Sequence, residues 1–186
     1  MAKHSLETDR CILRPPIPED VTVWAATLYA DPDVMRYLPK RRMSPQQLAE
    51  RRLKRFNASW EGFPYGGWSI VTKHDEKVIG NCGLEYLPDT DEVELGYAIS
   101  KAHWGQGFTT EIARAAVRFG FEIANLKKII GVVVPENTAS WRVLERVGFV
   151  FVKNTVYYDL DVVYYTIQPD QFTYGDLFYQ ARRLDE

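Results

Sequence analysis

The sequence is poor in the residues that cross-link small proteins or bind metals. It has only two cysteines and three histidines in 186 residues, and none of them falls in a metal-ligand spacing. Cys11 and Cys82 lie far apart, so we expect both to be reduced, half-buried core residues, and we expect no bound metal. Lys and Arg number 23 against 25 Asp and Glu, and the net charge of −2 does not suggest a dedicated nucleic-acid-binding protein. We therefore expect no sequence-specific nucleic-acid partner.

Long apolar runs are missing as well. The first residues contain none, which argues against a signal peptide, and no stretch reaches the roughly 18 apolar residues of a membrane span. We expect a soluble, cytoplasmic protein without a membrane partner. What the sequence does contain is 46% hydrophobic and 13% aromatic residues, which argue against disorder. The length predicts one domain over residues 1–186.

The hydrophobic pattern predicts a sheet with helices packed on it. We expect strands over 10–14, 68–72, 78–86, 92–99, 128–134, 149–152 and 157–167, and helices over 18–29, 31–37, 44–60, 108–124 and 137–147. A turn is expected at Pro88-Asp89. Helices alternate with strands only in the second half, so the pattern indicates a mixed α/β (α+β) fold and not a doubly wound one.

A glycine-rich segment, Trp104–Glu111 (W-G-Q-G-F-T-T-E), lies between a predicted strand and a predicted helix. Gly105 and Gly107 allow a backbone to approach an anion closely, and the amides of the helix start would point at it. A diphosphate is the natural ligand, although glycines that serve only turn geometry remain the alternative. No Lys-Ser/Thr pair follows, and Thr110 replaces the third glycine of the dinucleotide motif, so the two common nucleotide-binding loops are excluded.

Five blocks of this sequence stand in an order and spacing typical of one family. They are Thr8–Pro15, Val78–Leu84, Val93–Tyr97, Trp104–Glu111 and Pro135–Phe149, and together they span about residues 6–172. The chain resembles the GCN5-related N-acetyltransferases (GNAT), and within them the RimJ/RimL-like ribosomal-protein N-terminal acetyltransferases. The resemblance implies a twisted, mostly antiparallel mixed sheet of about seven strands, in which strands four and five splay apart to admit the pantetheine arm of acetyl-CoA.

The resemblance also implies where acetyl-CoA, the co-substrate, would bind. The fourth strand would be residues 92–99, with backbone of Tyr97, Ala98 and Ile99 pairing with the pantetheine arm. The pyrophosphate would lie on the loop Trp104, Gly105, Gln106, Gly107, Phe108, Thr109 and Thr110. Asn137 is expected as a helix N-cap that also touches the pantetheine arm. Arg142 either reaches the adenosine phosphates or lies in solvent.

Two departures from the family pattern bear on mechanism. Trp104 and Thr109 replace the usual Gln or Arg and the usual Gly or Ala of the loop, although an aromatic residue is normal in the Rim-like branch. Leu144 stands where many relatives have a tyrosine general acid, so that role cannot be transferred. The resemblance points to Ser140 instead, whose alternative is a small packing residue. Glu94 is the implied base or substrate anchor, and Glu92 points to the same face of the strand.

These features predict an acetyl-CoA-dependent N-acetyltransferase, in which an amine attacks the thioester directly in a ternary complex. The expected acceptor is a protein or peptide α-amine, such as that of a ribosomal protein, or a small amine. The alternative is a non-catalytic acyl-CoA-binding or regulatory domain, for which the Leu144 departure leaves room.

Two further features of the sequence each allow two interpretations. The basic runs 40–42 and 51–55 are either a solvated helix face or a docking surface for an acidic partner such as a ribosomal protein or RNA. Beyond the core, about residues 6–172, the tail over about 173–186 has an apolar helical stripe: Leu177, Phe178, Ala181 and Leu184. This stripe needs a surface to bury against, either its own domain or the second subunit of a homodimer.

Overall fold

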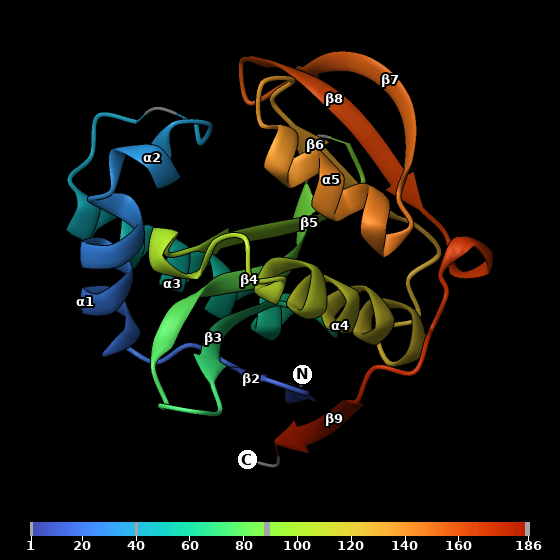
Figure 1. The fold of residues 1–186 in the computed structure, drawn as a ribbon, viewed down its shortest axis with the longest axis horizontal. Coiled ribbons are helices and arrows are strands. Elements are labelled where there is room, and N and C mark those ends of the chain that lie inside the picture. The colour runs from blue at the N-terminus through green and yellow to red at the C-terminus, as the bar shows by residue number, and fades with distance from the viewer. Residues whose placement is uncertain (1, 40, 88–89, 185–186) are drawn as a thin grey trace.

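The structure, a computed structural model, describes residues 2–39, 41–87 and 90–184. Their strands form one sheet in the order β7-β8-β6-β5-β4-β3-β2-β1-β9 (Figure 1). The strands are β1 (Lys3–Thr8), β2 (Cys11–Arg14), β3 (Gly67–Thr72), β4 (Val78–Leu87), β5 (Glu92–Ile99), β6 (Ile129–Val133), β7 (Val150–Tyr157), β8 (Leu160–Ile167) and β9 (Tyr179–Leu184). The expected mixed, mostly antiparallel sheet is confirmed, with nine strands in place of about seven.

Helices pack on both faces of this sheet. They are α1 (Asp20–Trp24), continued by a π-helical turn (Ala25–Tyr29), α2 (Pro32–Met35), α3 (Pro45–Gly62), α4 (Phe108–Glu122) and α5 (Thr138–Val147). In Figure 1, α4 crosses the near face and α3 lies behind the sheet. The two inner strands β3 and β4 are buried along nearly their whole length because both of their faces are covered.

Local sequence signals account for the helix starts. Ser44 accepts a hydrogen bond from the Gln47 amide while the Gln47 side chain accepts one from the Ser44 amide, so α3 opens with a capping box. The α3 face that carries Phe56 and Trp60 is fully buried. No helix in the described ranges has both the length and the apolarity needed to cross a membrane.

The sheet opens between β6 and β5, the third and fourth strands in its order. Antiparallel β4 and β5 pair along eight positions, from Gly80↔Ile99 to Leu87↔Glu92. In contrast, parallel β5 and β6 pair only at Glu94↔Ile130. The two strands therefore diverge beyond Glu94, which leaves the second half of β5 without a strand on that side.

The C-terminal segment differs from the helical stripe expected from the sequence. Residues 179–184 form strand β9 and not a helix, because β9 pairs antiparallel with all six residues of β1. Tyr179 and Ala181 pack against the core of the same chain, whereas Leu177 and Phe178 remain about half exposed. A short apolar stripe does not distinguish a helix from a strand, and the free edge of β1, a strand that the sequence analysis missed, decided between them.

Smaller corrections concern a turn and the cysteines. The segment expected as one strand over 157–167 contains a hairpin turn, because Tyr158 and Asp159 both have positive φ, as a two-residue type I′ turn requires. Cys11 and Cys82 are fully buried and free, and burial raises the pKa of each thiol to about 12. The expected turn at Pro88-Asp89 and the first residue of the 40–42 run lie outside the described residues.

Candidate active site

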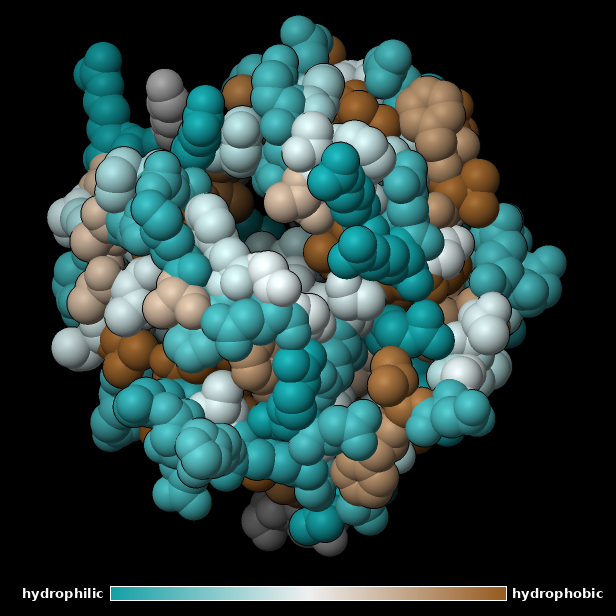
Figure 2. Space-filling model, viewed as in Figure 1, coloured by the Kyte–Doolittle hydropathy of each residue, from teal (hydrophilic) through white to brown (hydrophobic). Residues whose placement is uncertain are grey.

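A cavity of ≈ 250 Å³ opens where β5 and β6 diverge. Its walls come from the second half of β5, from β6, from the start of α5 and from an arginine-rich side of α3. Figure 2 shows the hollow in the molecular surface between the α2 region and the α5 region. The cavity brings together Glu94, Tyr97, Ala98, Asn137 and Ser140, five of the residues that the sequence analysis singled out.

Glu94 lies in the cavity wall, directly before the point of divergence. The hydroxyl of Tyr158, from the β7–β8 turn, donates a hydrogen bond to Glu94 Oε2. Burial raises the pKa of Glu94 to about 7, an effect that nearby Glu85 reinforces and that Tyr158 and the neighbouring arginines oppose. A carboxylate with this pKa exchanges its proton near neutrality, which suits a general base.

Glu92, two residues earlier on β5, has a different environment. It forms an ion pair with Lys128 at 2.7 Å and accepts a hydrogen bond from the Tyr157 hydroxyl at 2.6 Å. Although burial acts to raise its pKa, these bonds and a further one from Tyr164 lower the pKa of Glu92. The side chain is therefore held as a structural anion, outside the cavity lining.

The sequence analysis missed a third carboxylate, Glu85, which lies opposite Glu94 in the β4–β5 register. Glu85 is buried and forms ion pairs with Arg52 and, at 2.7 Å, with Arg55. Arg52 and Arg55, from the run that the sequence left open between a solvated helix face and a docking surface, therefore turn toward the sheet. A single charged residue in the otherwise uncharged strand 78–87 was the signal that could have identified Glu85.

Ser140 stands at the opposite wall of the cavity. Its amide donates to Asn137 Oδ1 at 3.2 Å, so the structure has Asn137 as the N-cap of α5. The hydroxyl of Tyr97 lies 3.0 Å from Ser140 Oγ, and burial raises the pKa of Tyr97 well above its usual range. Leu144, at the position where many relatives have tyrosine, is buried against Gly131 and offers no hydroxyl. Only the backbone of Tyr97 was assigned a role from the sequence, yet its protonated hydroxyl meets Ser140.

The glycine-rich loop lies at the N-terminus of α4. Gly105 and Gly107 have φ of +73° and +82°, and Gly107 is the N-cap of α4 without any side-chain cap. The first amides of a 15-residue helix are thus left without a side-chain acceptor, as an anion site requires. Trp104 Nε1 donates to the Ile99 carbonyl at 2.8 Å and ties the loop to the end of β5.

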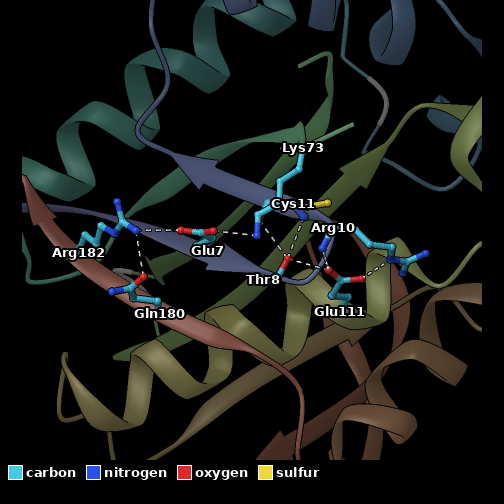
Figure 3. A network of polar contacts seen from close by, with 8 residues as sticks. All are labelled: Glu7, Thr8, Arg10, Cys11, Lys73, Glu111, Gln180 and Arg182. Atoms are coloured by element: carbon cyan, nitrogen blue, oxygen red, sulfur yellow. Dashed lines mark hydrogen bonds and ion pairs between the residues drawn. The ribbon is translucent and has the colours of Figure 1, made fainter. Parts of the chain in front are cut away.

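A polar network anchors this loop to the β1–β2 turn (Figure 3). Glu111 pairs with Arg10 Nε at 2.7 Å and accepts a hydrogen bond from Thr8 Oγ1 at 2.7 Å. Arg10 also donates to the Gln106 carbonyl at 2.8 Å and stacks over the Phe108 ring at 4.2 Å. The sequence analysis assigned no role to Arg10 or Glu111, because their contact spans about a hundred residues of chain.

Some of the expected cofactor residues are not part of the cavity lining. Ile99 and Trp104 to Thr110 are outside its lining, and Arg142 is exposed, with its guanidinium 5.7 Å from the Trp141 ring. Within the described part of the chain, no three His, Cys, Asp or Glu side chains form a group that could hold a metal ion.

Known proteins share both sequence and fold with this chain. Residues 10–150 match the family model of the acetyltransferase (GNAT) domain. The N-acetyltransferase p20 of Bacillus licheniformis is 32% identical over 148 residues, which cover 78% of this chain and 82% of p20. An acetyltransferase of Agrobacterium tumefaciens superposes with a TM-score of 0.79 at 26% identity, covering 88% of this chain and 94% of the other. The structure of Mycobacterium smegmatis RimJ in complex with CoA-disulfide shares the fold, with a TM-score of 0.74 at 20% identity over 91% of this chain and 88% of the other.

Proposed function

This chain belongs to the GNAT acetyltransferase family and is an N-acetyltransferase, and we propose that it transfers the acetyl group of acetyl-CoA to an α-amine with Glu94 as the base. The observation that carries the proposal is the position of Glu94. Its carboxylate, with a pKa of about 7, lines the cavity at the point where β5 and β6 diverge. The amine attacks the thioester carbonyl directly in a ternary complex, so the protein contributes positioning and proton transfer.

The residues around the opened sheet fit acetyl-CoA as the co-substrate. The free edge of β5 at Tyr97 and Ala98 offers backbone groups to the pantetheine amides, with Asn137 on the facing wall. The loop Gly105–Thr110 offers helix-start amides to the pyrophosphate, and its neighbour Trp104 ties it to β5. The RimJ structure holds a CoA derivative on the same fold, which supports this assignment.

Ser140 and Tyr97 protonate the departing thiolate of coenzyme A. The two hydroxyls lie 3.0 Å apart, and Ser140 is in the first turn of α5, where amide dipoles favour a developing negative charge. Because the pKa of Tyr97 is raised by burial, its hydroxyl stays protonated and can resupply Ser140. The pair takes the place of the tyrosine that Leu144 replaces.

The acceptor must be neutral when it attacks, and this requirement favours an α-amine. A free α-amino group with a pKa near 7.8 is roughly 10–20% neutral at pH 7, whereas a lysine near 10.4 is neutral only about once in 2,500 molecules. The pKa of Glu94, about 7, lies close to that of an α-amine, so the transfer of a proton from an α-amine to Glu94 is easier than the transfer from a lysine. Ribosomal-protein N-termini and small α-amino compounds both meet this condition.

The test is the pH dependence of a Glu94→Gln variant with a peptide acceptor. In the wild type, kcat/KM rises as Glu94 ionises through about pH 7 and then levels off. The variant depends on amine that is already neutral, so its kcat/KM is about 10²-fold lower at pH 6 and continues to rise toward the amine pKa near 8. The deficit therefore shrinks at alkaline pH.

Glu92→Gln is the matched control, since it removes the same charge two residues away on the same strand. Because Glu92 lies outside the cavity lining, this variant should keep the wild-type pH profile. A pH-independent deficit in Glu94→Gln would contradict the base role. Lysine side chains or aminoglycosides that react far faster than peptide N-termini would contradict the α-amine assignment.

A further inference from the structure

We propose that the acceptor carries a carboxylate near its amine and that Arg41 and Arg51 bind this carboxylate; the inference rests on the acetyl transfer proposed above. The amine would then meet Glu94 while the carboxylate lies toward the α3 wall. The proposal defines a substrate class, amines with an acidic group close by, and excludes polycationic acceptors.

The charge of the cavity is the first observation. Among the described residues, its charged lining consists of four arginines and two glutamates: Arg41, Arg51, Arg52, Arg55, Glu85 and Glu94. With Glu94 partly protonated near neutrality, positive charge dominates the space in which the acceptor must bind. Such a lining attracts an anionic group and repels a second ammonium group.

The pairing of these arginines is the second observation. Arg52 and Arg55 both contact Glu85, so their charge is partly neutralised within the wall. Arg41 and Arg51 line the same cavity with exposed side chains, and neither is paired with any of the described residues. Two unpaired guanidinium groups at one cavity are suited to a carboxylate, whose two oxygens match their donor geometry.

A buried donor on the same side is the third observation. Asn81 is 1% exposed and lines the cavity, and its Nδ2 makes no hydrogen bond of normal geometry to the described residues, although the Tyr29 hydroxyl interacts with the same amide. Arg52 Nε donates to Asn81 Oδ1 at 3.3 Å and so fixes the orientation of the amide. A buried donor without a hydrogen bond of normal geometry is costly, and an oxygen of a bound ligand would satisfy it.

The coenzyme does not account for Arg41 and Arg51. The proposed pyrophosphate loop at the start of α4 contributes none of the described residues that line the cavity. Arg41 lies between α2 and α3 and Arg51 lies on α3, and both line the cavity. The two arginines are therefore placed to contact the acceptor.

Three dipeptide amides test the proposal: Ala-Glu, Ala-Gln and Ala-Lys, each with the same α-amine. The rate of thiol release from acetyl-CoA gives kcat/KM for each peptide. We expect Ala-Glu to exceed Ala-Gln by about tenfold and Ala-Lys to be the poorest acceptor. In the double variant Arg41→Gln/Arg51→Gln the three values should converge, because the preference comes from these two charges.

Arg42→Gln is the matched control. Arg42 is exposed and is adjacent in sequence to Arg41, but it does not line the cavity, so the preference for Ala-Glu should persist. In the Arg51→Glu variant, kcat/KM for Ala-Lys should exceed kcat/KM for Ala-Glu. Because each readout is a ratio between peptides on one preparation, a partly unfolded variant does not alter it.

Other outcomes overturn the proposal. Equal kcat/KM for the three peptides in the wild type would overturn the carboxylate site and leave acetyl transfer standing. A preference that survives in the double variant would remove Arg41 and Arg51 from acceptor binding. If all peptides fail while acetyl-CoA still binds, the proposed function falls and this inference falls with it. RNA binding lost in the double variant, without any peptide preference in the wild type, would assign the arginines to a nucleic-acid surface instead.

Discussion

Glu92 and Glu94 are the same residue type on the same strand, yet their pKa values move in opposite directions. Glu92 has Lys128 and two tyrosine hydroxyls around it, whereas Glu94 has Tyr158 and the negative charge of Glu85. Direct partners outweigh the cost of burial for Glu92, and burial prevails for Glu94. Surroundings contributed by distant parts of the chain thus separate a structural anion from a candidate base.

Ser140→Ala tests the other catalytic assignment at this scale. We expect kcat to fall about tenfold or more, because a donor to the departing thiolate acts mainly in the transition state. The KM for acetyl-CoA should change little, since the Ser140 backbone amide that bonds Asn137 is retained. Steady-state kinetics with both substrates varied separate the two constants.

Tyr97→Phe provides the comparison, since it removes only the hydroxyl 3.0 Å from Ser140 Oγ. A smaller loss of kcat in Tyr97→Phe than in Ser140→Ala would agree with a relay through Ser140. An effect of Ser140→Ala confined to KM would reduce Ser140 to a binding residue.

At the level of elements, the loop before α4 is held from both ends. Trp104 fastens it to β5, and the Arg10–Glu111 pair fastens it to the β1–β2 turn (Figure 3). The loop itself can therefore use left-handed backbone at Gly105 and Gly107 to direct amides outward.

Gly107→Val should weaken acetyl-CoA binding at least tenfold while the chain still folds. A Cβ at this position would meet Arg10 Nη2 at 3.5 Å, an ordinary contact, so space is not the obstacle. The obstacle is φ of +82°, which costs an L-residue about 1–2 kcal/mol and is worst for a β-branched one. Calorimetric titration with acetyl-CoA measures the loss.

Gly62→Val is the matched control for this substitution. Gly62 ends α3 with no atom near its missing Cβ and without a positive φ, so the affinity for acetyl-CoA should stay as in the wild type. Unchanged affinity in Gly107→Val would show that the loop is not the pyrophosphate site.

Across the whole molecule, the two ends of the chain close one edge of the sheet. β1 and β9 pair along six residues, and Arg182 contacts Glu7 between them. β9 lies far in the sheet order from the diverging pair β5 and β6, so this edge contributes to stability and not to the site.

Removal of residues 176–186 should therefore lower the free energy of unfolding and leave the rate of acetyl transfer unchanged. Cross-strand pairs contribute about 0.2–1 kcal/mol each, so six pairs should amount to about 3 kcal/mol. In a chain of this length that lowers Tm by roughly 6–12 °C. Thermal unfolding followed by circular dichroism measures the shift, and kcat at 20 °C should remain near the wild-type value.

A truncation to residue 175 that abolished activity while the protein stayed folded would contradict the separation of this edge from the site.

The sequence by itself determined the features that depend on local chemistry. The capping box at Ser44, the N-cap at Asn137, the glycines of the loop and the bounds of β5 all follow from residues near one another in the chain. The family resemblance added the splayed strands and drew attention to Glu94 and Ser140.

Only the tertiary structure decided what depends on partners distant in sequence. The surroundings of Glu94 join β4, β5, α3 and the β7–β8 turn, and Glu111 meets Arg10 across about a hundred residues. The tail became a strand because β1 offered it an edge. A pKa, an ion pair and a strand pairing are properties of surroundings, and those surroundings exist only after the chain has folded.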